Sequence, residues 1–157
     1  MKYYRYFSEL EIEMDVEGHD LGRFVDAQNS IYSRVTAELA EGAKQSHWMW
    51  FIFPQVEGLG SSPMAQRYAI RSRAEAEAYL AHPMLGGRLV ECTRLLLEVQ
   101  DRSLRQILGT PDDIKFRSSM TLFDCIRPGA EFASALDRYC GGARDPATLA
   151  FLRRGTP

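Results

Sequence analysis

Two polar side chains, those of His47 and Gln55, stand at either end of the most apolar stretch of the sequence, residues 46–55. Between them lie both tryptophans of the chain, Trp48 and Trp50, with two phenylalanines, an isoleucine and a methionine. Leaving a large apolar side chain in water costs roughly 1.5–3 kcal/mol, so the stretch must join the core or form the floor of a pocket. The polar residues at its ends favour the pocket and make all four named residues candidates for ligand binding.

These residues also have a structural interpretation, which stays open at this point. A histidine beside a tryptophan near a helix N-terminus is more often a satisfied, partly buried ring than a catalytic base, and this applies to His47. Trp48 and Trp50 are more often core residues than stacking platforms. Because they are two positions apart, they would diverge by about 200° on a helix, and only one of them could face a given ligand.

A lysine occupies an unusual position in the helix that the sequence predicts over residues 111–126. At about 100° per residue, Lys115 and Ser119 fall on the same broad arc as Phe116, Met120 and Phe123, the apolar face of this helix. A charged amine that faces the core is costly unless a partner neutralises it. The first turns of a helix also favour an anion, through the helix dipole and the unpaired backbone N–H groups.

The functional hypothesis is that Lys115, with Arg117 or Ser119, holds a phosphate or carboxylate beneath the aromatic residues. Ser118 would extend the same preference for an anion.

Two alternatives to this hypothesis remain open. Lys115 could instead pair with a buried acid such as Glu38 or Glu91, or extend its amine to the surface.

Arg67 and Tyr68, which follow the glycine-containing loop at residues 55–61, could reach the same pocket or form an ordinary surface pair.

No catalytic motif stands alone in this chain. The sequence has no GxSxG nucleophile elbow, no GxxxxGK[ST] phosphate loop and no HExxH metal site, so the catalytic residues are unknown and enzymatic activity is an open question. The three cysteines, Cys92, Cys125 and Cys140, are widely spaced and form no Cys/His ligand pattern. We therefore expect no metal site, no cofactor and free thiols.

Composition indicates a soluble globular protein of one domain. The chain has 157 residues, 25% of them charged and 45% hydrophobic, with a net charge of −2. This charge gives no support for a general nucleic-acid-binding surface. No run of about 20 apolar residues is present, and the N-terminus lacks an apolar signal core, so we expect a cytoplasmic protein with no membrane association.

Hydrophobic periodicity predicts an all-α fold with an N-terminal extension. Residues 1–18 place acids at alternate positions between apolar residues, a period of two that is typical of a half-buried strand or an extended arm. Residues 19–157 change to helical spacing and read as a single compact domain of eight or nine short to medium helices. The expected helices cover approximately residues 20–42, 46–53, 63–70, 72–80, 85–101, 103–108, 111–126, 131–140 and 146–152.

Several of the expected helices carry capping signals. Asp20 is a candidate N-cap for the first helix, and Ser72 with Glu75 matches a capping box. Thr110 and Pro111 give the clearest start in the chain, a cap followed by a proline at the first helical position.

Several segments in order resemble one protein family. They are residues 21–28, residues 46–55 (SHWMWFIFPQ), residues 64–70, residues 79–83 and residues 113–123 (DIKFRSSMTLF). Together they resemble a small bacterial family of domains of unknown function, with mycobacterial members, whose sequences often carry the label "calpastatin". The resemblance runs from about residue 21 to residue 152 and implies a compact, mostly helical domain. It implies no established catalytic residues, and the label does not fit, because calpastatin-type inhibitors are long, repetitive and disordered.

We expect this domain to bind a small anionic or nucleotide-like metabolite in an aromatic-lined pocket. In this interpretation His47 or Asp113 takes part in proton transfer, while Trp48 or Trp50 stacks on a base or sugar. Two alternatives remain: a protein-interaction module that uses the aromatic segment as its contact surface, and a homo-oligomer that does the same.

Overall fold

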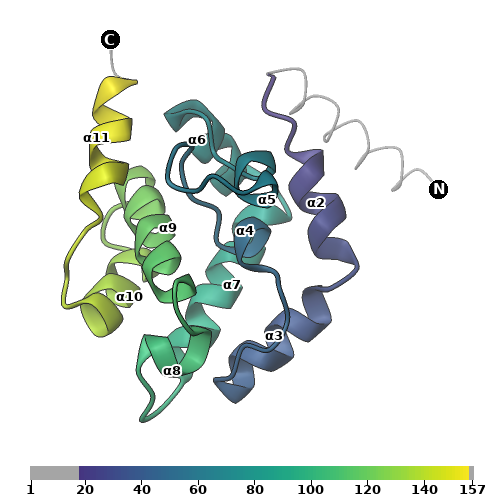
Figure 1. Cartoon of the computed structure of the whole chain (residues 1–157), viewed down its shortest axis with the longest axis vertical. Helices are drawn as coiled ribbons and strands as arrows, with labels where there is room; N and C mark the ends of the chain where they lie inside the picture. The colour runs from purple at the N-terminus through teal and green to yellow at the C-terminus, as the bar shows by residue number, and fades with distance from the viewer. Residues whose placement is uncertain (1–17, 156–157) are drawn as a thin grey trace.

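Ten helices form within residues 18–155, the part of the chain that the computed structural model describes (Figure 1). In chain order they are α2 (Gly22–Asn29), α3 (Tyr32–Glu41), α4 (Met49–Ile52), α5 (Pro63–Arg67), α6 (Arg73–Ala81), α7 (Leu85–Glu98), α8 (Leu104–Leu108), α9 (Asp112–Ile126), α10 (Glu131–Cys140) and α11 (Pro146–Arg154). The all-α fold is confirmed. The strand or arm expected at residues 1–18 lies outside the described residues, except for Gly18.

The tenth helix arises because the segment expected as one helix over residues 20–42 is two. α2 ends at Asn29 and α3 starts at Tyr32, with Ser30 and Ile31 between them. Asparagine and serine compete with the helix through their own side-chain hydrogen bonds, which accounts for a break at this point. Asp20 is not the N-cap, because its φ is 46° and the helix begins after Leu21.

The capping predictions hold for α6 only in part. Ser72 accepts the backbone N–H of Glu75 at 3.0 Å, but the Glu75 carboxylate accepts the backbone N–H of Arg71 instead of returning to Ser72. The prediction for α9 was wrong by one residue. Pro111, preceded by a cis peptide bond, is the N-cap, and no side chain caps this helix.

The helices are arranged with α4 and α7 in the middle of the molecule (Figure 1). α2 and α3 lie on one side, where α2 contacts α4 and α3 contacts α7. On the other side α9, α10 and α11 pack together, and α10 contacts α7. α4 therefore lies between elements from both halves of the sequence.

Residues 46–55 are largely interior, as their composition predicts. Trp48, Met49, Phe51, Ile52 and Phe53 are each 6% exposed or less. After α4 the chain is fixed by a parallel bridge between Val56 and Ile70, an isolated pair, and no strand forms among residues 18–155. None of the described helices combines the length and apolar character needed to cross a membrane.

Candidate functional site

A small hollow lies between α4 and the N-terminal end of α9. Its walls come from α4 and the residues that follow it, from α5, and from α9. The lining residues are Met49, Trp50, Phe53, Gln55, Ala65, Tyr68 and Lys115. The hollow encloses about 10 Å³ of free space, enough for about one water molecule or one oxygen atom of a larger group.

Lys115 contributes an unpaired ammonium group to this hollow. Its side chain is half-buried, and Nζ lies 5.7 Å from the centroid of the Trp50 ring. No carboxylate within residues 18–155 forms an ion pair with it. Glu38 and Glu91, the acids considered as partners, accept hydrogen bonds from Trp48 and Tyr32 instead. The ammonium therefore faces an aromatic ring and solvent.

The two tryptophans have opposite environments. Trp48 is 0% exposed, and its Nε1–H donates to Glu38 Oε1 at 2.9 Å. Trp50 is half-buried and lines the hollow, and its Nε1 is buried without a hydrogen-bond partner in the described part of the chain. Only Trp50 is therefore positioned to contact a ligand in this hollow, and Trp48 is a core residue.

The wall opposite α9 depends on close packing of a glycine loop. The carbonyl of Gln55 accepts the backbone N–H of Ile70 at 2.9 Å, which fixes the chain where it leaves α4. A Cβ at Gly60 would lie 2.7 Å from Cβ of Ala65 and 3.5 Å from Nε2 of Gln55. Only glycine lets the loop pass this close to α5, and the wall formed by Gln55 and Ala65 depends on it.

Tyr68 and Arg67 stand together at the same wall. Tyr68 lines the hollow, and its ring packs against Phe51 at a centroid distance of 5.3 Å. Arg67 is exposed, and its Nε donates to the Tyr68 hydroxyl at 3.3 Å. Arg67 thus contacts a lining residue without lining the hollow itself.

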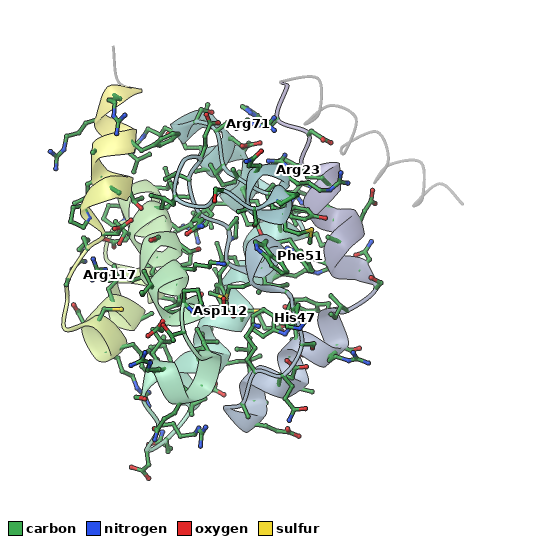
Figure 2. All side chains as sticks on the ribbon, viewed as in Figure 1. Arg23, His47, Phe51, Arg71, Asp112 and Arg117 are labelled. Atoms are coloured by element: carbon green, nitrogen blue, oxygen red, sulfur yellow. The ribbon has the colours of Figure 1, made fainter. Side chains whose placement is uncertain are left out.

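His47 is exposed and lies close to the start of α9. Lys44 Nζ donates to the carbonyl of Ser46 at 2.7 Å and pairs with Asp112 at 3.0 Å. Lys44 therefore links the residue before His47 to the first turn of α9; His47 and Asp112 are both labelled in Figure 2. The imidazole forms no hydrogen bond with any described residue and does not line the hollow.

Arg117 and Ser118 face away from the hollow, toward α11. Ser118 Oγ donates to Asp145 Oδ2 at 3.0 Å, and Arg117 lies 3.9 Å from Asp145 Oδ1. Figure 2 shows Arg117 on the side of α9 remote from His47 and Phe51. Ser119 is 0% exposed, and its hydroxyl has no partner among residues 18–155.

The positive end of the α9 dipole is already occupied by acids. Asp112 pairs with Lys44, and the Asp113 carboxylate accepts the backbone N–H of Ile114 at 2.9 Å. The contribution of the helix terminus that we expected for an anion is therefore largely used within the protein. Lys115 is the cation left to act on a ligand in the hollow.

Three lining residues were not among the sequence candidates. Phe53 is the C-cap residue of α4 and follows Met49 by four positions, a spacing that puts the two side chains on one face, and both line the hollow with Trp50. That spacing was a usable signal. Ala65 reaches the hollow from α5 through the packing of the Gly60 loop, and nothing in the local sequence indicates this.

Two larger grooves have no unsatisfied buried polar atom on their lining residues, although each is lined by an exposed arginine, Arg127 or Arg105, that has no ion pair within residues 18–155. One of about 580 Å³ runs along α6 and α7, and its Arg94 pairs with Glu131 at 2.6 Å. The other, of about 300 Å³, lies between α8, α9 and α10 and contains Arg117. Three buried polar side-chain atoms lack a partner in the described region, and of these only Trp50 Nε1 belongs to a residue that lines the hollow or either groove.

The described residues contain no reactive cysteine site and no group of metal ligands. All three cysteines are free thiols. Burial raises the pKa of Cys92 to about 12 and also raises the pKa values of Cys125 and Cys140, so none is a ready thiolate. No cluster of three potential metal ligands occurs in residues 18–155.

The chain is similar to a solved mycobacterial structure. The crystal structure of the conserved hypothetical protein Rv1873 from Mycobacterium tuberculosis matches with a TM-score of 0.85 and 52% sequence identity. The match covers 87% of this chain and 98% of the mycobacterial chain. A search of curated proteins found no match.

A family match covers most of the sequence. The model of a family described as "Protein of unknown function (DUF1810)" matches residues 18–152, which include every residue that lines the hollow. The chain belongs to the DUF1810 family.

Proposed function

We propose that this domain binds a small anionic metabolite whose charged group enters the hollow between Trp50 and Lys115. The observation that carries the proposal is the presence of two unpaired donors on residues that line the same hollow, the indole N–H of Trp50 and the ammonium of Lys115, whose Nζ lies 5.7 Å from the centroid of the Trp50 ring. Neither has an acceptor among residues 18–155. A carboxylate or phosphate oxygen would satisfy both.

The energetics favour an anionic ligand over a neutral one. A buried donor without a partner costs about 1–3 kcal/mol, and a hydrogen bond to a charged group contributes about 1.5–3 kcal/mol. The hollow offers an ammonium and an indole N–H, both of which can only donate. Its remaining lining is mostly apolar, so an anionic oxygen would be little screened by water.

The surroundings extend this site outward. Gln55 also lines the hollow, and Arg67 donates through its Nε to the hydroxyl of Tyr68, another lining residue. His47 is exposed and follows Ser46, which Lys44 links to the first turn of α9, so its imidazole is a candidate contact for the part of a ligand that lies outside the hollow. In this proposal Trp50, Gln55 and Lys115 hold the anionic group, and His47 and Arg67 are candidates for contact with the rest of the ligand.

The two alternatives, a protein-interaction module and a homo-oligomer that uses the aromatic segment as its contact surface, have less support. A contact surface built from the aromatic segment would need that segment to be exposed, yet Trp48 and Phe51–Phe53 are buried. The described residues that are large, apolar and exposed are Met64 and Ile114. They do not belong to the aromatic segment, so the segment itself offers little area to a partner.

A titration with sodium phosphate and sodium acetate, followed through tryptophan emission, tests the proposal. The wild-type protein should show a saturable change, because Trp50 lies at the site. Lys115→Met should weaken binding by about 1 kcal/mol or more, or roughly fivefold, since it removes one charge-assisted hydrogen bond.

Lys44→Met is the matched control. Lys44 is also a lysine over a tryptophan, at 5.0 Å from the Trp48 ring, but its ammonium already pairs with Asp112. This variant should lose some stability and keep its affinity for phosphate and acetate. An unchanged affinity in Lys115→Met, or an equal loss in Lys44→Met, would contradict the assignment.

A further inference from the structure

The groove between α8, α9 and α10 has the size and the lining of a small-molecule site. Its volume of about 300 Å³ is within the range of clefts that bind small ligands. Its walls combine four largely apolar side chains with two arginines: Leu104, Ile114, Tyr139, Cys140, Arg105 and Arg117. Such a lining suits a molecule that has an apolar body and one charged group.

This groove is separate from the hollow at Trp50. Asp113 and Arg117, which line the groove, each lie two positions from Lys115 on α9, so they diverge from it by about 200° around the helix. The groove and the hollow have no lining residue in common. A molecule in the groove would therefore be a second ligand, whose binding does not depend on the proposed function.

The two arginines of the groove have donors to offer. Arg105 is exposed and has no ion pair within residues 18–155. Arg117 lies 3.9 Å from Asp145 Oδ1, a long contact for an ion pair. Each guanidinium carries five N–H donors and no acceptor, and its planar fork can bind a carboxylate or phosphate through two parallel hydrogen bonds. The groove therefore favours an anion.

Asp113 also lines the groove and limits its positive charge. Its carboxylate accepts the backbone N–H of Ile114 at 2.9 Å and forms no ion pair with Arg105 or Arg117. Burial raises the pKa of the Cys140 thiol, Arg117 lowers it and Asp113 raises it, so both charged groups act on the same part of the groove. Two cations and one anion among the lining residues match a monoanion such as a carboxylate better than a phosphate dianion.

Ile114 gives the groove an apolar surface that is open to solvent. It is 62% exposed, whereas Met64, the other exposed large apolar side chain among the described residues, is 37% exposed. The lining also includes Leu104, which is 7% exposed. An aliphatic chain that lay against Ile114 would remove apolar surface of both partners from water, which is favourable.

We propose that this groove binds a small carboxylate with an aliphatic body and is a ligand site distinct from the hollow. The carboxylate binds to Arg105 and Arg117, and the aliphatic body covers Ile114. A short carboxylate lacks the apolar contact, and a neutral chain of the same length lacks the charged one. Both should therefore bind less tightly than a molecule that has the two parts together.

Three probes separate the charge from the aliphatic body. Sodium octanoate has both, sodium acetate has the charge alone, and octan-1-ol has the chain alone. Binding is followed through the ¹³C methyl signals of Ile114, assigned with Ile114→Val. Octanoate, kept below the concentration at which it forms micelles, should move these signals to saturation. Its dissociation constant should be about tenfold or more below those of acetate and octan-1-ol.

Arg105→Gln tests the charged contact. Octanoate should bind about fivefold or more weakly, with the melting temperature unchanged, because Arg105 has no ion pair among the described residues. Arg127→Gln is the matched control, since Arg127 is likewise exposed and without an ion pair in residues 18–155 but lines the other groove. It should leave the affinity for octanoate unchanged. An equal loss in both variants would overturn the assignment to Arg105.

Lys115→Met distinguishes the groove from the hollow. The Ile114 signals should still respond to octanoate in this variant, because Lys115 does not line the groove. Loss of the response would place octanoate in the hollow and overturn the second site. In the wild-type protein, stationary Ile114 signals, or equal affinity for octanoate and octan-1-ol, would also overturn it. Neither result would affect the anion site at Trp50, which is measured separately through tryptophan emission with acetate.

Discussion

Trp48 and Trp50 are the same residue type two positions apart, and their indole N–H groups meet opposite environments. The N–H of Trp48 donates to the carboxylate of Glu38, whereas that of Trp50 is buried without a partner among the described residues. Ser118 and Ser119 repeat this contrast on α9. In each pair one member is hydrogen-bonded within the fold, and the other leaves a buried polar atom without a partner among the described residues.

The tryptophan pair gives a prediction for stability. Trp48→Phe should lower the free energy of unfolding by about 1–3 kcal/mol, because a hydrogen bond to a buried carboxylate is lost. Trp50→Phe should change it by no more than about 0.5 kcal/mol, since the N–H that it removes has no partner in residues 18–155. Urea unfolding followed by far-UV circular dichroism measures both values. A larger loss for Trp50→Phe than for Trp48→Phe would show that the two roles are reversed.

Between elements, one arginine joins three segments that are distant in the sequence. Arg23 of α2 donates to the carbonyls of Arg67 and Ala69 at 2.8 and 2.9 Å, and it pairs with Glu75 of α6 at 3.2 Å. Arg23 and Glu75 are both buried. Their contacts hold the end of α5, which carries one wall of the hollow, against α2 and α6.

Arg23→Met should therefore be strongly destabilising. It leaves the Glu75 carboxylate buried and without its cation, a change that costs about 3–5 kcal/mol. The free energy of unfolding in urea measures the loss. Adding Glu75→Gln to the same protein should restore part of it, because the uncompensated charge is then gone. A single variant as stable as the wild-type protein would contradict this role of Arg23.

The turn between α3 and α4 is organised by Glu38, which makes stability depend on pH. Burial alone would raise the pKa of Glu38, but hydrogen bonds from Ser46, Gln45 and Trp48 outweigh it and lower the pKa from 4.5 to about 2. An acid with a lowered pKa in the folded state contributes stability above its unfolded value of 4.5. This contribution is lost as the pH falls from 4.5 toward 2.

The expected loss for Glu38 is about 2–3 kcal/mol across that window. Urea unfolding of the wild-type protein and of Glu38→Gln at pH values from about 2 to 6 measures it as the difference between the two proteins, which removes the effect of other acids. The difference should shrink as the pH falls below 4.5. A difference that stays constant with pH would mean that the carboxylate is not held ionised by these donors.

The sequence predicted most helices because their signals are local. Ser62 before α5, Ser103 with Gln106 at α8 and Asp145 before α11 cap their helices as the capping rules predict. One error lies where a distant residue competes. Glu75 leaves its expected capping role for Arg71 and Arg23, and Arg23 is far from it in the chain.

At the scale of the whole molecule, a row of four packed aromatic rings connects α2 on one side with α10 on the other. Phe24 of α2 meets Tyr79 of α6 at a centroid distance of 5.0 Å, and Tyr79 meets Phe123 of α9 at 5.5 Å. Phe123 in turn meets Phe132 of α10 at 5.8 Å. These four rings make the described helices depend on one shared core.

Phe123→Ala should lower the free energy of unfolding of the domain by about 3–5 kcal/mol, because it removes a central ring of this row and leaves a cavity. Unfolding followed by circular dichroism and by tryptophan emission should still give coincident transitions, since the helices share one core. Separate transitions for the two signals would show that the two sides unfold independently.

The candidate site was only partly predictable because three separate segments build it. Spacing on α9 placed Lys115 on an apolar face, and composition marked residues 46–55, so the sequence indicated two of the segments. It could not show which tryptophan lines the hollow or that Arg117 and Ser118 face Asp145. Those facts depend on how α4, α5 and α11 pack against α9.

The most direct measurement is the indole N–H spectrum of the ¹⁵N-labelled protein during a titration with sodium acetate. The protein has two tryptophans and therefore two indole signals, assigned through Trp48→Phe and Trp50→Phe. The Trp50 signal should move progressively and saturate, while the Trp48 signal, already bonded to Glu38, stays in place. A stationary Trp50 signal, or equal movement of both, would contradict an anion site at Trp50 and Lys115.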